Sequence, residues 1–328
     1  MKLTRRGFGR VSIAAGLMSA LGSTSVLAQN SQDNGLVRFI VPYSPGTGSD
    51  AIARSVGIML GERLGRPVVV ENRVGASTRI GTEAVVRAAP NGSTLLITTN
   101  TMVINRALYP KSNFDPIKDL TPITISGWTQ MVLVANERAG IKSVDDLLRA
   151  ARKAPGKINY GSPGIGTLHH LAMELLKIKT DVDLLHVPFN GSGPAVTGLL
   201  AGEISVMFLP LTFAVAQIKS GRIIPLAIGS EKRDAALPEV PTLRELGIPD
   251  MNVPAWYGIY GPAGMPPGLV DKLNAELRQI LQSDETRKRL SHAGVEAADS
   301  TAEELRQLTI RDADRWALVV KAQGIQAE

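Results

Sequence analysis

The chain contains no cysteine, and this absence excludes several kinds of chemistry at once. Disulfides, a thiolate nucleophile and cysteine metal sites need not be considered. Three motifs are missing as well: the phosphate-binding G-x-x-x-x-G-K-[ST], the zinc-protease H-E-x-x-H and the G-x-S-x-G nucleophile elbow. Histidine is scarce, with 4 residues. His169 and His170 are neighbours, and adjacent helical side chains point about 100° apart, so they make a poor joint metal site. His186 and His292 are interpreted as structural.

Excess positive charge is also small once the N-terminus is set aside. The formal net charge is +6, but Lys2, Arg5, Arg6 and Arg10 supply four of these charges, which leaves about +2 for the rest. No basic run interleaves with aromatic residues, so the sequence predicts no nucleic acid partner.

The first residues have the order of an export signal. A basic stretch, "MKLTRRGFGR", precedes the apolar "VSIAAGLMSALGS" and a small-residue pattern that ends at Ala28. The "TRRGFGR" segment is a twin-arginine signature. A membrane anchor is the alternative, but the apolar run is short for a span of about 20 residues. We predict a Tat-type signal peptide over residues 1–28, cleavage after Ala28 and export to the periplasm.

Strand and helix patterns alternate along the remaining chain. Residues 38–41, 67–71 and 93–98 read as buried strands, with helical patterns at 49–64 and in "GTEAVVRAA" between them. Such alternation predicts parallel sheets. The pattern restarts after residue 157, and two amphipathic helices follow at 267–283 and 301–323. We predict a Tat leader over 1–28, a first α/β domain formed by 36–132 and 257–328, and a second formed by 133–256. The chain would cross between the domains near 128–135 and again near 254–260.

Four glycine-rich loops each connect a predicted strand to a predicted helix. They are "VPYSPGTGSD", "NRVGASTRIG", "GSPGIGTLHH" and "PFNGSGPAV". The first amide groups of a helix have no intrahelical partner and favour negative charge. Glycine lets the backbone approach a ligand closely. The four loops together indicate an anion site between the two domains, although any one of them is equally explained as a tight turn.

A dinucleotide is the competing anion. "GTGSDA" at residues 46–51 matches G-x-G-x-x-A, and Glu71 ends the next strand. Against this interpretation stand Pro45 at the entry of the loop and Asp50, whose charge lies where pyrophosphate would bind. A Tat-exported dinucleotide-dependent oxidoreductase therefore remains the alternative function.

The sequence resembles the extracytoplasmic solute receptors of tripartite tricarboxylate transporters, the Bug receptors. The segments that carry the resemblance run from about residue 37 to 325 and include "VPYSPGTGSDAIAR", "LGRPVVVENRVGA", "INYGSPGIGTLHHLAMELL" and "HVPFNGSGPAVTGLLAGEISVMF". The resemblance implies a two-lobed periplasmic binding protein of the type II (Venus flytrap) class, with mostly parallel sheets and two crossing strands as hinge. It implies no enzymatic activity and no cofactor. It also implies a small carboxylate ligand, membrane transporter subunits as partners, and a monomer. A ligand sensor that feeds a signalling partner is a second alternative.

The resemblance also assigns the ligand-binding residues, position by position. The implied ligand-binding set is Tyr43, Pro45, Gly46, Thr47, Gly48, Ser49, Asp50, Ser162, Gly164, Gly166, Thr167, His169, Pro188, Phe189, Asn190 and Gly191.

Three departures from the family pattern bear on the ligand. Leu209 and Pro210 stand where the family often has an acidic residue, which removes a partner for a ligand ammonium. Arg79 replaces a short polar residue and is added to the predicted site, because arginine clamps a carboxylate with two hydrogen bonds. An exposed cation or a structural ion pair is the other interpretation of Arg79, and both stay open. Trp128 and Gln130 are candidates for the cleft wall, and Trp128 is equally interpreted as a core residue. These departures favour an acid with an apolar or aromatic body and leave a dicarboxylate open.

Overall fold

The computed structural model describes residues 35–326. The predicted signal peptide and the cleavage site after Ala28 lie outside the described residues. Among those residues, no helix combines the length and the apolar character that a bilayer span requires.

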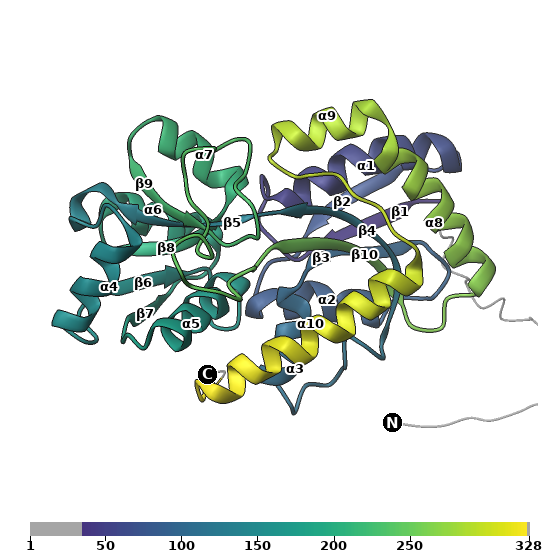
Figure 1. Cartoon of the computed structure of the whole chain (residues 1–328). Helices are drawn as coiled ribbons and strands as arrows, with labels where there is room; N and C mark the ends of the chain where they lie inside the picture. Colours follow the sequence, from purple (N-terminus) through teal and green to yellow (C-terminus); the bar gives the residue numbers. More distant parts are fainter. Residues whose placement is uncertain (1–34, 327–328) are drawn as a thin grey trace, which may run out of the picture. The chain divides into compact units, whose positions relative to one another are not determined.

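Two five-stranded sheets with the same construction organise the chain (Figure 1). The orders are β2-β1-β3-β10-β4 and β7-β6-β8-β5-β9, and in each sheet one strand, β10 or β5, runs opposite to the other four. The prediction of two mostly parallel α/β sheets is confirmed. The strands are β1 Val37–Val41, β2 Val68–Asn72, β3 Thr94–Thr99, β4 Leu120–Thr129 and β10 Ala255–Pro262 in the first sheet, and β5 Met131–Asn136, β6 Asn159–Ser162, β7 Leu185–Pro188, β8 Val206–Pro210 and β9 Ile223–Ile228 in the second.

Helices cover both faces of each sheet, because neighbouring strand residues point to opposite sides. Phe39 packs with α1, α8 and α9, whereas Ile40 packs with α2, α3 and α10. In the second sheet, Leu133 faces α4 and α5, and Val134 faces α6 and α7. The helices are α1 Gly48–Leu64, α2 Arg79–Val86, α3 Thr101–Leu108, α4 Val144–Lys153, α5 Leu168–Thr180, α6 Ser192–Ala201, α7 Leu211–Lys219, α8 Pro267–Gln282, α9 Asp284–His292 and α10 Ala302–Ala322, with short 3-10 turns η1 Ala76–Thr78 and η2 Glu137–Ala139.

The chain crosses from one sheet to the other twice, where the sequence predicted it. The strand β4 ends at Thr129, and β5 begins two residues later in the second sheet. The return crossing enters β10 at Ala255, which pairs with Thr129. Helix α10 also joins the two halves: its Leu305 packs with the first sheet, and its Trp316 belongs to the core of the second. The predicted domain boundaries remain a prediction.

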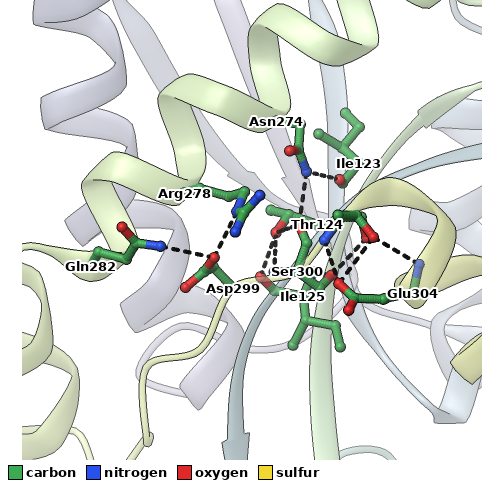
Figure 2. Close-up of polar contacts among 10 residues, drawn as sticks. Ile123, Thr124, Ile125, Asn274, Arg278, Gln282, Asp299, Ser300 and Glu304 are labelled. Atoms are coloured by element: carbon green, nitrogen blue, oxygen red, sulfur yellow. Dashed lines mark hydrogen bonds and ion pairs between the residues drawn. The ribbon is translucent and has the colours of Figure 1, made fainter.

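A polar network fixes the C-terminal segment to the first sheet (Figure 2). The Thr124 hydroxyl donates to the Ser300 carbonyl at 2.9 Å, and the Ser300 amide donates back to the Thr124 hydroxyl at 3.0 Å. Asn274 on α8 donates to the carbonyls of Ile123 and Ser300 at 2.6 and 2.8 Å. These bonds attach the linker before α10 to the edge strand β4. The C-terminal helices thus return to the first sheet, as predicted.

Candidate ligand-binding site

A cavity of about 710 Å³ lies between the two sheets, at the carboxyl ends of their parallel strands. The loops after β1, β2 and β3 line it from the first sheet, and those after β6, β7 and β8 line it from the second. Open α/β sheets bind ligands at this edge. A volume of this size is in the range of small-molecule sites.

The structure brings most of the predicted residues together in the wall of this cavity. The predicted residues that line it are Tyr43, Thr47, Gly48, Ser49, Gly164, Thr167, His169, Pro188, Phe189, Asn190 and Gly191. The others, Pro45, Gly46, Asp50, Arg79, Ser162 and Gly166, do not line it, and neither do Trp128 and Gln130. Direct ligand contact by any of these residues stays a prediction.

Asp50 supports the first loop from behind the cavity wall. Its carboxylate accepts hydrogen bonds of 3.0 Å from the Gly46 amide, from Arg54 and from Asn72. Burial raises the pKa of Asp50, but the bonds from Arg54, Gly46 and Asn72 outweigh it, so that the pKa lies below its ordinary value. The negative charge at the start of α1 is therefore already neutralised inside the protein.

The second loop repeats this construction with a histidine in place of the carboxylate. The Gly166 amide donates to His170 Nδ1 at 3.2 Å, four residues later, as the Gly46 amide does to Asp50. The His170 ring stacks on His186 with centroids 3.9 Å apart, and His186 Nε2 is 2.7 Å from the Ser162 hydroxyl. Burial lowers the pKa of His170 to about 4 and that of His186 to about 3. Gly166 and Ser162 thus hold the loop in place and leave the cavity wall to their neighbours.

Arg79 lies beside the cavity with Tyr109 between them. Its guanidinium carbon is 4.2 Å from the centre of the Tyr109 ring, and Tyr109 lines the cavity. Arg79 itself lines only a small neighbouring cavity. Its buried Nε has no hydrogen-bond partner among the described residues. This cation–π contact is neither the exposed cation nor the ion pair of the alternative interpretation, and the carboxylate clamp stays a prediction.

Several lining residues were missed in the sequence. They include Thr99, Thr101, Tyr109, Met131, Phe213, Ala255 and Tyr257, together with residues 74–78 of the fourth loop. Among these, the fourth loop carried a local signal, its glycine, but Arg79 was the residue predicted from that loop. Tyr257 reaches the cavity from the reversed strand β10, which no local pattern indicates. Leu209 and Pro210, noted as departures, do line the cavity.

The turn at residues 75–78 is strained. Ala76, Ser77 and Thr78 have φ values of 45°, 49° and 80°, a left-handed region that non-glycine residues rarely adopt. Asn105 on α3 donates to the Ser77 carbonyl and to the Thr78 hydroxyl. The Ser77 hydroxyl donates to the Ile165 carbonyl of the second sheet's loop at 2.8 Å. Strain that surrounding contacts maintain clusters at functional sites.

Three helices that start at the cavity, α1, α5 and α6, have no hydrogen bond from an N-cap side chain, although the Leu168 amide of α5 donates to the Thr101 hydroxyl at 3.4 Å. At α1 and α5 the N-cap hydroxyls of Thr47 and Thr167 donate to the carbonyls of Ser44 and Gly164 instead, at 3.0 and 2.8 Å. At α6 the N-cap is Gly191, which has no side chain to offer. By contrast, side chains cap α4, α9 and α10, which start away from the cavity; α8, which opens with two prolines, has no such cap. Uncapped first-turn amides aimed at a cavity are an anion site.

None of the described residues that line the cavity is an Asp, Glu, Lys or Arg. The one histidine in the wall, His169, is kept neutral near pH 7 because burial lowers its pKa to about 4. No cluster of three or more His, Asp or Glu side chains that could hold a metal ion occurs in residues 35–326. An anion in this cavity would be held by neutral donors.

Two α/β lobes with a ligand-sized cavity between them define a two-lobed binding protein, and comparison with known proteins gives the family. Residues 52–325 match the model of the tripartite tricarboxylate transporter family receptor. The chain belongs to this family. A UPF0065 protein in the tcbD-tcbE intergenic region of Pseudomonas sp. (strain P51) is 35% identical over 311 residues, 94% of this chain and 93% of the relative. BugT of Bordetella pertussis is 32% identical over 290 residues, 88% of this chain and 89% of the relative.

Solved structures agree with this assignment. Rpa4515 of Rhodopseudomonas palustris, solved with adipate, is 30% identical with a TM-score of 0.83, over 89% of this chain and 98% of that one. MatC of the same organism, solved with bound malate, is 30% identical with a TM-score of 0.79, over 87% of this chain and 98% of that one. The chain is a solute receptor of a transport system and not an enzyme. The oxidoreductase alternative is not favoured, because two residues of the dinucleotide-binding pattern already have partners inside the protein. The Gly46 amide donates to Asp50, and Glu71 pairs with Arg73 at 2.7 Å.

Proposed function

We propose that this receptor captures a small organic acid in the cavity between its lobes and delivers it to a tripartite tricarboxylate-type membrane transporter. The observation that carries the proposal is the set of uncapped helix starts at α1, α5 and α6, which face one uncharged cavity. The ligands of the two solved relatives, adipate and malate, are carboxylates, which supports the same class here.

A carboxylate is costly to bury unless it is hydrogen-bonded or paired. First-turn amides supply hydrogen bonds and a favourable dipole without a fixed cation. Charge-assisted bonds of this kind are roughly twice as strong as neutral ones. The amide hydrogen bonds supply the affinity for the acid. Because no lysine or arginine is present in the described wall, no ion pair slows the release of the acid.

Capture would couple to closure of the lobes. A ligand that contacts loops of both lobes binds the closed form better and shifts the population toward it. Direct bonds already join the two sides: Ser77 to Ile165 at 2.8 Å, and the Leu168 amide to the Thr101 hydroxyl at 3.4 Å. We place the hinge at the two crossings beside Thr129 and Ala255, where the lobes share paired strands.

The proposal also covers the location of the protein, its oligomeric state, its partners and its domain boundaries. The mature protein would work in the periplasm as a monomer after the signal peptide 1–28 is removed behind Ala28. Its partners would be the membrane subunits of the transporter. Residues 36–132 and 257–328 would form the first domain, and residues 133–256 the second.

Ser192 offers a test of the amide site. Ser192 lines the cavity and is the first residue of α6. Proline is tolerated at the first position of a helix. Ser192→Pro removes one amide donor, and Ser192→Ala is the matched control because it keeps that donor. With an acid found by a thermal-shift screen, calorimetry should show about a tenfold or larger loss for Ser192→Pro, since a hydrogen bond to a charged group contributes about 1.5–3 kcal/mol. Ser192→Ala should stay close to the wild type.

The screen itself can contradict the proposal. A ligand at 100 times its dissociation constant adds about 2.7 kcal/mol to the free energy of unfolding. If no carboxylate stabilises the protein, or if each acid and its uncharged amide act alike, the proposed function is wrong.

A further inference from the structure

We infer that the cavity takes a monocarboxylate with a bulky apolar body of about the size of a phenyl ring, and discriminates against dicarboxylates and amino acids. This inference rests on the proposed function and narrows its ligand class. It follows from what the cavity wall contains on its apolar side and from which charges the wall lacks.

The wall is rich in aromatic side chains for a chain that has few. The sequence has only 6 Phe, 5 Tyr and 3 Trp residues, yet Tyr43, Tyr109, Phe189, Phe213 and Tyr257 all line this cavity. Aromatic rings prefer to pack against other rings in stacked or edge-to-face arrangements. A ligand without an apolar body would leave these surfaces in contact with water.

The apolar surface is concentrated on the second lobe. Phe189 in the loop after β7 and Val196 on α6 pack with Leu209 at the end of β8 in one cluster, and Phe213 follows on α7. The same α6 helix presents its uncapped start at Gly191 and Ser192. A polar anchor and an apolar wall therefore lie next to each other, as an acid group on an apolar body requires.

The missing charges exclude the competing ligands. One carboxylate that bridges the lobes uses the helix starts of both, so a second carboxylate would lie against the apolar wall formed by Phe189, Val196 and Leu209. No Lys or Arg lines the described wall to pair with it there. Arg79, which lies beside the lining residue Tyr109, is stacked on its ring. An amino acid would bury an ammonium group with no carboxylate to receive it, because the described wall contains no Asp or Glu and β8 ends in Leu209 and Pro210. A buried charge without a partner is disfavoured.

Four compounds separate these features one at a time in calorimetry with the wild-type protein. The compound 3-phenylpropionate has one carboxylate and a ring. Phenylalanine adds only the ammonium, and 3-phenylpropionamide removes the charge. Glutarate carries a second carboxylate instead of the ring, on a chain that is one methylene group longer. We expect 3-phenylpropionate to bind at least about tenfold more tightly than each of the other three, the size of discrimination that pocket contacts supply.

Two positions test the wall itself. Phe213→Ala should weaken 3-phenylpropionate by about tenfold or more and change glutarate binding much less. Leu209→Asp supplies a carboxylate for the ligand ammonium and should move the preference from 3-phenylpropionate toward phenylalanine by about tenfold. Leu209→Asn, whose side chain has nearly the shape of aspartate but no charge, should not. Thermal melting shows whether each variant is folded, and the wild-type series decides the matter if Leu209→Asp does not fold.

The outcomes distinguish the inference from the proposed function. If glutarate or adipate binds as tightly as 3-phenylpropionate, the ligand class is wrong while the carboxylate receptor stands. If phenylalanine binds best, the uncharged wall does not exclude ammonium and the inference fails in the same way. If none of the acids binds, both the inference and the proposed function are overturned.

Discussion

Charged residues around the cavity are directed toward one another or into the protein. Asp50 is 4% exposed and is bonded to Arg54, Asn72 and the Gly46 amide. Arg79 lies on the ring of Tyr109. The wall that remains is neutral, so the binding of an anion depends on backbone donors whose positions these charged residues maintain.

Asp50 should matter for stability more than its place in the first helical turn suggests. Asp50→Asn removes the charge that three donors share, and we expect a loss of about 2 kcal/mol in the free energy of unfolding, the range for bonds to a charged group. Denaturant unfolding at pH 7 measures it. Asp145→Asn, in the first turn of α4, is the control, because its pair with Arg149 is exposed and surface pairs contribute little. Equal losses for both variants would show that the Asp50 network is not special.

Arg79 should act through Tyr109. Arg79→Ala removes a cation–π contact, worth about 0.5–2 kcal/mol, so the melting temperature should fall. Acid binding should weaken only about threefold, equivalent to about 0.7 kcal/mol, and by the same factor for a monocarboxylate and a dicarboxylate. A loss confined to dicarboxylates, measured by calorimetry, would restore the clamp that the sequence allowed.

The loop residues were predictable because glycine and strand ends leave local marks. Gly48, Gly164 and Gly191 follow strands and precede helices, and all three line the cavity. Tyr109 and Phe213 carry no such mark, since only the packing of the two sheets brings them to the wall. Asp50, Ser162 and Gly166 show the limit of such marks: they share a motif with lining residues but do not line the cavity.

At the scale of elements, the strained turn η1 and the loop after β6 form one of the direct contacts between the lobes on the cavity side. The left-handed conformation of Ala76, Ser77 and Thr78 costs roughly 1–2 kcal/mol per residue. Asn105 maintains it through two bonds. The result is a fixed hydroxyl on Ser77 that reaches Ile165.

Ser77→Ala tests whether this contact belongs to ligand capture. We expect acid affinity to fall about threefold to tenfold, because the closed form loses one hydrogen bond of about 0.5–1.5 kcal/mol. Ala76→Gly is the control: it relieves backbone strain at the neighbouring residue and keeps the Ser77 bond, so affinity should be retained. Unchanged affinity in Ser77→Ala would reduce the contact to a local one.

Helix α5 carries His169 and His170, and strand β7 carries His186; these three histidines should make stability depend on pH. Folding lowers the pKa of His169 and His170 to about 4 and that of His186 to about 3, chiefly through burial. The unfolded chain therefore binds protons that the folded chain does not, from about pH 6.5 down to about 4. This contribution to stability is complete above pH 6.5 and falls as the pH drops, by up to about 1.4 kcal/mol per pH unit for each histidine.

Unfolding free energies measured at several pH values between 7 and 4 check this slope. The double variant His170→Gln, His186→Gln should flatten it, because two of the three groups no longer titrate. An unchanged slope would show that these two histidines are not the source.

Helix prediction succeeded where the sequence marks both ends. The helix predicted over 301–323 forms as α10, whose N-cap is Thr301 in a capping box with Glu304. Helices α3 and α7 were missed because each follows a strand directly, with Asn100 or Pro210 as an N-cap that makes no side-chain bond. Helix α9 was missed although Ser283 caps it, because its polar sequence lacks a clear apolar face.

At the scale of the whole molecule, two sheets with the same strand order present their carboxyl ends to one cavity. The alternation of strands and helices predicted the sheets, and the unusual strand pattern near Trp128 predicted the crossing. The position of α10 was predicted only in part, since Trp316, Val319 and Val320 also pack into the second core. Such contacts between distant segments are set by tertiary packing and leave no periodic signal.

The measurement that tests the central claim most directly is an amide ¹H–¹⁵N titration of the protein with the acid that gives the largest thermal shift. The account predicts downfield shifts of the first-turn amides of α1 and α6, including Gly48, Ser49 and Ser192, which saturate together with one dissociation constant. Amides of α4, which starts away from the cavity under its own Ser143 cap, should not respond. Saturable binding that leaves the α1 and α6 amides unshifted, or that shifts the amides of only one lobe, would contradict capture between two sets of helix starts.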